Sequence, residues 1–140
     1  SDKPAVLLAG GTGFGPVKAI VEHAFRQKSV RPMALYWGAR DRAGLYLHEL
    51  AASWAASHPG FKYVPVLSEA QPGDGWLGRN GLVHRAVMAD FPDLSGHQVY
   101  ACGAPAMIEA ARFDFISRCG LKNEDFFADA FTFAAESVSP

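Results

Sequence analysis

The architecture of this chain follows from the stretch Ala5-Val-Leu-Leu-Ala-Gly-Gly-Thr-Gly-Phe-Gly-Pro16. It opens with a short apolar run of strand length, and four glycines with one threonine follow directly. Pro16 comes next and suits a first helical turn, because its φ is already helical and its missing N–H is not needed there. An amphipathic run then continues to about Lys28. The stretch therefore predicts a strand, a tight glycine turn and a helix.

The glycine turn has the features of an anion site. Glycines let a ligand approach the backbone without a Cβ in the way, and free N–H groups at a helix start favour negative charge. A phosphate or pyrophosphate is the expected anion. However, Pro16 stands where the dinucleotide fingerprint has its third glycine, and Lys18 is not placed as in a P-loop. The alternative is a glycine-rich connection without a ligand.

Composition narrows the class of protein. The chain has 140 residues, 49% hydrophobic and 19% charged, so one folded domain is expected. Its net charge is −1 without a basic run, which argues against nucleic acid and membrane surfaces as partners. The apolar runs are too short to span a bilayer, and Cys102 and Cys119 form no metal-binding pattern. We expect a cytoplasmic protein without a structural metal.

Strand-like and helix-like segments alternate along the chain. Strands are expected at 5–9, 33–37, 61–67 and 98–102 and within 125–133, and helices up to about 28 and at 45–58, 81–91 and 106–118. This alternation predicts an α/β fold: a doubly wound, five-stranded parallel sheet, Rossmann-like, with helices on both faces. Pro65 suggests an edge position for its strand, because proline cannot donate to a ladder.

Three loops leave the carboxyl ends of the predicted strands, at 10–16, 38–42 and 103–107. In open α/β sheets, ligands bind outside these ends, where the strand order reverses. The first and third loops flank that point if strands 5–9 and 98–102 are neighbours. These three loops are therefore the expected binding region.

Four motifs occur in one order along the chain. They are Gly11-Thr-Gly-Phe-Gly-Pro16, Tyr36-Trp-Gly-Ala-Arg40 with Leu45-Tyr46 behind it, Tyr100-Ala-Cys-Gly-Ala-Pro-Ala-Met107, and Phe127-Ala-Asp-Ala-Phe131. Together they resemble the NAD(P)H-binding domain of the ferredoxin–NADP reductase family, above all bacterial NAD(P)H–flavin reductases and the reductase components of oxygenases. The resemblance covers the chain from about Pro4 to Phe133.

The resemblance implies a definite activity. Residues 1–140 would form a single NAD(P)-binding domain, and the flavin-binding barrel domain would lie outside this chain. The domain would deliver hydride from the nicotinamide of NAD(P)H to FAD or FMN. Electrons would then pass to an iron–sulfur centre, an oxygenase component or free flavin. Such a chain is an oxidoreductase domain that is inactive without its flavin domain.

The resemblance also implies roles for particular residues, by their place in the motifs. The expected cofactor-binding residues are Gly11, Thr12, Gly13 and Pro16 at the pyrophosphate, Gly38, Arg40 and Asp41 in the loop toward the adenosine ribose, and Gly103, Ala104, Pro105 and Met107 toward the nicotinamide. Cys102 would lie close to the reacting carbon and Phe131 near the flavin ring, so these two are the catalytic candidates. We expect Thr12→Val or Gly13→Val to weaken nucleotide binding while leaving the fold intact.

Several alternatives stay open from the residues alone. Cys102 and Phe131 could both be ordinary core residues. Arginine suits a 2′-phosphate and a carboxylate suits ribose hydroxyls, so Arg40 followed by Asp41 leaves NADH and NADPH both open. The family often has Asp-Leu-Tyr where this chain has Gly44-Leu-Tyr46, which weakens any inference on that choice. The alternative functions are a non-catalytic dinucleotide-sensing module and, more weakly, a phosphate-handling hydrolase.

Overall fold

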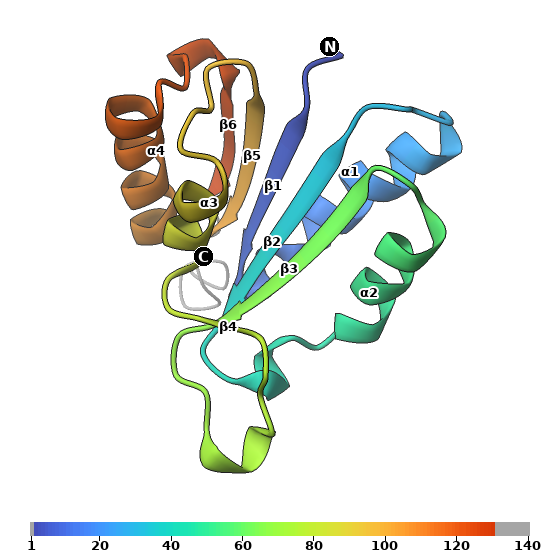
Figure 1. Ribbon diagram of the computed structural model, residues 1–140, viewed down its shortest axis with the longest axis vertical. Coiled ribbons are helices and arrows are strands. Elements are labelled where there is room, and N and C mark those ends of the chain that lie inside the picture. Colours follow the sequence, from blue (N-terminus) through green and yellow to red (C-terminus); the bar gives the residue numbers. More distant parts are fainter. Residues whose placement is uncertain (1, 131–140) are drawn as a thin grey trace, which may run out of the picture.

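A computed structural model describes residues 2–130 and shows one twisted sheet of six parallel strands (Figure 1). The strands are β1 (Ala5–Gly10), β2 (Met33–Ala39), β3 (Phe61–Leu67), β4 (Arg79–Asn80), β5 (Gln98–Gly103) and β6 (Phe126–Ala130). Their order across the sheet is β4-β3-β2-β1-β5-β6. The order reverses between β1 and β5, which are paired, so two of the expected binding loops do flank the reversal.

The sheet has six strands, and the predicted number of five is wrong. The additional strand, β4, is two residues long and pairs with Val66 and Leu67 at the end of β3. It lies in a polar loop without an apolar run, so no periodicity marks it in the sequence. Pro65 is not on the outermost strand, but β4 does not extend along β3 as far as Pro65, so no carbonyl of β4 lies opposite its missing N–H.

Four helices cover both faces of the sheet, as predicted (Figure 1). On one face lie α1 (Phe14–Arg26) and α2 (His48–Ser57), and on the other lie α3 (Val83–Asp90) and α4 (Pro105–Cys119). The expected helix at 45–58 begins later, at His48, because the backbone of Leu45 (ψ 66°) and of Leu47 (ψ 36°) is not helical. Gly120 ends α4 with a φ of 71°, a left-handed conformation that glycine adopts at low cost.

Alternation along β1 creates two core layers. Val6 and Leu8 pack with α3 and α4, whereas Leu7 and Ala9 pack with α1 and α2. All four side chains are fully buried. A strand buried on both faces needs this continuous apolar run, which explains why the first segment of the chain has no polar alternation.

A groove lies between α1 and β6, on the face of the sheet that carries α1 and α2. Its volume is about 350 Å³, with Pro16 and Ile20 of α1 on one side and Cys102 among its lining residues. Tyr100 stacks on Phe127 of β6 in this groove, with ring centroids 4.8 Å apart. Phe127 lies on the edge strand β6 and is 40% exposed, so the groove has an accessible aromatic wall.

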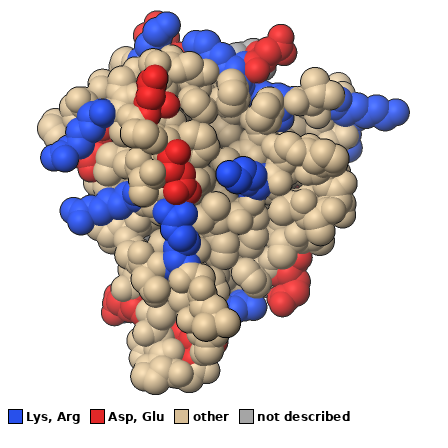
Figure 2. All heavy atoms as spheres, in the orientation of Figure 1, with Lys and Arg blue, Asp and Glu red and all other residues tan. Residues whose placement is uncertain are grey.

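The charged residues form a mixed surface. On the face shown in Figure 2, basic and acidic side chains are interspersed, and neither sign gathers into a large patch. Among residues 2–130, none of the helices has the length and apolar character that crossing a bilayer requires.

Candidate functional site

The glycine turn joins β1 to α1 at the centre of the sheet edge. Gly11–Gly13 form a 3₁₀ turn that runs directly into α1, and Gly11 has a φ of 53°. Gly11 and Thr12 are exposed. In the described part of the chain, no side chain caps this turn or the start of α1. The turn therefore presents an exposed helix start that can accept an anion.

Gly13 has a different role, because it is buried against the end of β5. A Cβ at this position would lie 2.2 Å from the carbonyl oxygen of Cys102 and 2.9 Å from the amide nitrogen of Gly103. These are backbone atoms that cannot turn aside. The expectation that Gly13→Val leaves the fold intact is therefore wrong, whereas exposed Thr12 can be replaced without such a clash.

Trp37 supports the turn from the end of β2. Its indole Nε1 donates to the carbonyl oxygen of Gly11 at 3.0 Å. The ring is fully buried and stacks on Phe14, the first residue of α1, with centroids 4.1 Å apart. The sequence motif contains Trp37, but its apolar surroundings gave no sign of this polar contact. The hydrogen bond fixes the glycine turn relative to the neighbouring strand.

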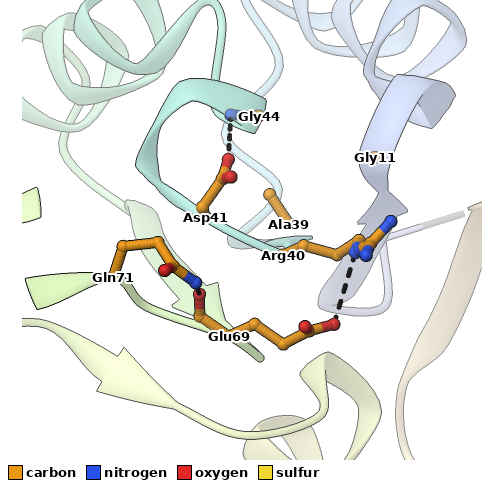
Figure 3. A pocket seen from close by; sticks show the side chains of 7 residues that line it. All are labelled: Gly11, Ala39, Arg40, Asp41, Gly44, Glu69 and Gln71. Atoms are coloured by element: carbon orange, nitrogen blue, oxygen red, sulfur yellow. Dashed lines mark hydrogen bonds and ion pairs between the residues drawn. The ribbon is translucent and has the colours of Figure 1, made fainter.

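A hollow of about 480 Å³ opens beside Gly11, at the ends of β2 and β3 (Figure 3). The side chains and backbone around it are those of Gly11, Ala39, Arg40, Asp41, Gly44, Glu69 and Gln71. Arg40 and Asp41 thus lie where the sequence predicts them. Glu69 and Gln71 were not predicted, because their loop after β3 contains no recognisable motif. Gly38 packs instead against Val83 of α3, to which a Cβ would come within 2.6 Å.

Each charged side chain at the hollow has a polar partner within the protein. Arg40 Nε lies 3.3 Å from Glu69 Oε2, and both side chains are largely exposed. The Asp41 carboxylate points the other way and accepts from the backbone N–H of Gly44 at 3.2 Å (Figure 3). An Asp at this position caps the short turn that follows, as short polar side chains commonly do.

The end of β5 approaches the end of β1 closely. Gly103 has a φ of 154°, and a Cβ there would lie 2.8 Å from Met107 Cε and 3.3 Å from the backbone nitrogen of Gly10. Ala104 and Pro105 begin α4 directly after this point. The expected nicotinamide-side residues are therefore gathered beside the glycine turn, where the Met107 side chain packs against the backbone of Gly103 and Gly10.

Cys102 ends β5 among these residues and is only 3% exposed. Burial, aided by the negative charge of Asp129 on β6, raises the pKa of its thiol to about 11. The thiol is therefore protonated at neutral pH and offers a small, uncharged surface rather than a nucleophile. Pro16 lines the same groove as Cys102. Phe131, the other catalytic candidate, lies outside the described residues.

Comparison with known proteins agrees with this arrangement. The sequence profile of the oxidoreductase NAD-binding domain matches residues 7–112. The chain is 49% identical over 130 residues to a CDP-6-deoxy-L-threo-D-glycero-4-hexulose-3-dehydrase reductase from Yersinia pestis, covering 91% of this chain and 38% of that protein. It is 40% identical over 133 residues to an NAD(P)H-flavin reductase from Aliivibrio fischeri, covering 95% of this chain and 55% of that protein.

Solved structures give the same result. A cytochrome P450 reductase from Amycolatopsis superposes with a TM-score of 0.84 at 36% identity, over 96% of this chain and 39% of that one. The resemblance to flavin reductases and oxygenase reductase components that the motifs indicated is thereby confirmed. The chain spans only about two fifths to a little over half the length of these proteins.

Proposed function

Because the chain belongs to the oxidoreductase NAD-binding domain family, we propose that it binds NAD(P)H across the ends of β2, β1 and β5 and presents its nicotinamide to a flavin. The observation that supports this most is the close packing of the glycine turn on the end of β5, where a Cβ on Gly13 would collide with the Cys102 carbonyl. This packing brings the anion site of the glycine turn next to the buried end of β5.

The residues fit the three parts of a dinucleotide. The pyrophosphate lies on the exposed N–H groups of Gly11 and Thr12, at the positive end of α1. The adenosine ribose occupies the hollow that contains Arg40 and Asp41. The nicotinamide ring lies at the end of β5, beside Gly103 and the Met107 side chain that packs against it.

The buried end of β5 suits hydride transfer between two cofactors. When bound, the dinucleotide supplies the hydride and the flavin accepts it, so the protein needs no strong acid or base there. The protonated Cys102 thiol and the Met107 side chain offer the ring uncharged contacts. Phe131, by its place in the fourth sequence motif, would contribute near the flavin ring. The work of these residues is orientation, which can contribute much of a rate enhancement.

The proposed partner is a flavin-binding domain seated in the groove between α1 and β6. This groove exposes Phe127 and Tyr100 and includes Cys102 among its lining residues, so a domain docked there would bring its flavin to the reactive end. FAD and FMN fit this proposal equally. We propose that electrons then pass from the flavin to an iron–sulfur protein, an oxygenase component or free flavin. The proposed location of the protein is the cytoplasm.

A chimera tests the proposal against a dinucleotide-sensing module. The chain would be joined to the part of the Aliivibrio fischeri NAD(P)H-flavin reductase that it does not match. We expect flavin reduction by NADH or NADPH in stopped-flow absorbance, and loss of most of that rate in a Phe127→Lys chimera. A Glu124→Lys chimera, altered at an exposed site in the turn before β6, serves as the control. Nucleotide binding without flavin reduction in an intact, flavin-loaded chimera would favour the sensing module.

A further inference from the structure

We infer that Glu69, through its ion pair with Arg40, makes the hollow at the ends of β2 and β3 selective for NADH over NADPH. The inference rests on the proposed function and adds which dinucleotide the site takes. Glu69 belongs to none of the sequence motifs, and it enters the hollow from a loop 29 residues further along the chain than Arg40.

The position of Glu69 is set by its backbone. Its N–H donates to the carbonyl oxygen of Arg40 at 2.7 Å, and the preceding N–H of Ser68 donates to Ala39 at 2.9 Å. The Gln71 side chain donates to the Glu69 carbonyl oxygen at 2.9 Å (Figure 3). These bonds join the exit of β3 to the exit of β2. The Glu69 carboxylate is therefore held beside Arg40 by more than the ion pair.

The side chains around the hollow carry one positive and two negative charges. Arg40 supplies the positive charge, and Glu69 and Asp41 supply the negative ones. Arg42, the next cation, is directed elsewhere: its guanidinium contacts the Leu45 carbonyl oxygen and lies 3.7 Å from Glu49. A 2′-phosphate would enter a site whose single guanidinium already faces a carboxylate.

The two carboxylates are not equivalent as ligand partners. Asp41 is oriented by its bond to the Gly44 N–H, as the cap of the 3₁₀ turn. The Glu69 carboxylate has oxygens open to solvent and can accept from the ribose hydroxyls, which is the usual role of an acidic residue at an NAD site. A phosphate at the 2′ position would instead be repelled by the negative charge of Glu69, which already offsets the charge of the one guanidinium at the hollow.

The exposure of the pair makes its role testable. The Arg40 and Glu69 side chains are 83% and 59% exposed, and surface ion pairs of this kind contribute little to folding. Glu69→Gln therefore removes the charge while the fold and the backbone bonds remain. It also releases Arg40, which is then free to pair with a 2′-phosphate.

The experiment is a calorimetric titration of the chain with ADP-ribose and with 2′-phospho-ADP-ribose, which lack nicotinamide and so do not depend on a flavin. We expect the wild-type chain to bind ADP-ribose at least about tenfold more tightly than 2′-phospho-ADP-ribose. Glu69→Gln should bring the two affinities to within about twofold of each other, mainly by improving the phosphorylated ligand. Glu124→Gln, the same change at a remote exposed carboxylate, should leave the preference intact.

A second variant isolates the part played by Arg40. Adding Arg40→Ala to Glu69→Gln should weaken the phosphorylated ligand again by about fivefold or more. Equal binding of both ligands by the wild-type chain, or an unchanged preference in Glu69→Gln, would overturn the inference and leave the proposed function standing. If neither ligand bound, the proposed function would fail and the inference with it.

Discussion

The two ends of the proposed site differ in what surrounds them. At the ends of β2 and β3, the Arg40 side chain is 83% exposed and its partner Glu69 is also largely open to water. At the end of β5, Cys102 is 3% exposed, and the backbones of Gly13, Cys102 and Gly103 leave no room for a Cβ between them. Substitutions at the open end should therefore change ligand binding alone. Substitutions at the closed end should change the fold as well.

The largest effect is expected at Gly13. Gly13→Val places side-chain atoms against the Cys102 carbonyl, so the turn or the end of β5 must move. We expect the free energy of unfolding to fall by about 3 kcal/mol, as for other overpacked sites, with loss of ADP-ribose binding. Urea denaturation followed by circular dichroism measures the free energy of unfolding, and calorimetry measures ADP-ribose binding.

Gly15→Ala is the matched control, because Gly15 lies in α1 with nothing outside its own helix within 4 Å of its Cβ position. Replacing it by alanine should leave the free energy of unfolding within about 0.5 kcal/mol of wild type, because the better helix propensity of alanine is offset by the contact of its Cβ with the ring of Pro16. Equal stability of the Gly13→Val variant and the wild-type chain would show that the closed end is not tightly packed.

Cys102 tests the chemistry of the closed end. Its thiol pKa is raised to about 11, from 9.0 for an unperturbed group, because burial disfavours the thiolate. At pH 8 the folded chain should therefore contain about 100-fold less Cys102 thiolate than the unfolded chain. Alkylation by iodoacetamide, followed by peptide mass spectrometry, should be slower by at least that factor. Labelling at the rate of the urea-unfolded chain would mean that Cys102 is an activated nucleophile.

Trp37 connects the two ends, since it holds the glycine turn from β2. Trp37→Phe removes the hydrogen bond to the Gly11 carbonyl but keeps an aromatic ring against Phe14. We expect a loss of about 1–2 kcal/mol in unfolding free energy and a several-fold weaker affinity for ADP-ribose. Trp54→Phe, in the same aromatic cluster, should lower stability without changing affinity. If both variants bound ADP-ribose normally, the Trp37 hydrogen bond would not be what positions the turn.

Thr12 should give the smallest effect. Thr12→Val preserves the shape of an exposed residue in the glycine turn and removes one hydroxyl. We expect ADP-ribose to bind about fivefold more weakly, the value of one hydrogen bond, with unfolding free energy within about 0.5 kcal/mol of wild type. Calorimetry measures the affinity for ADP-ribose and urea denaturation measures the unfolding free energy, on the same samples. A large loss of stability would instead mean that Thr12 is needed for packing, as Gly13 is.

Most of the fold could be predicted because its signals are local. Apolar runs marked five of the strands, helical spacing marked three helices, and the flanking Pro105 and Gly120 marked α4. The two-residue β4 carries no such signal, since it is defined by pairing with β3 and by the bond from the Trp76 indole to the Arg79 carbonyl. The start of α2 was also misplaced, because Leu45 and Leu47 fit the apolar spacing of a helix but have non-helical backbone angles.

The site was predictable only where a motif carried it. The glycine turn, Arg40, Asp41 and the residues after β5 come together as expected. Glu69 reaches the hollow through the parallel pairing of β2 with β3, and this pairing is a tertiary contact that no spacing in the sequence reveals. The tight approach of Gly13 to Cys102 is likewise a contact between residues far apart in the chain.

The most direct test of the central claim, that the glycine turn and the polar hollow anchor the dinucleotide, is a calorimetric comparison of NADH, ADP-ribose and reduced nicotinamide mononucleotide. We expect ADP-ribose to retain most of the affinity of NADH, and the mononucleotide to bind at least about tenfold more weakly, because it reaches neither the hollow nor the full pyrophosphate site. Tight binding of the mononucleotide together with no binding of ADP-ribose would contradict the claim.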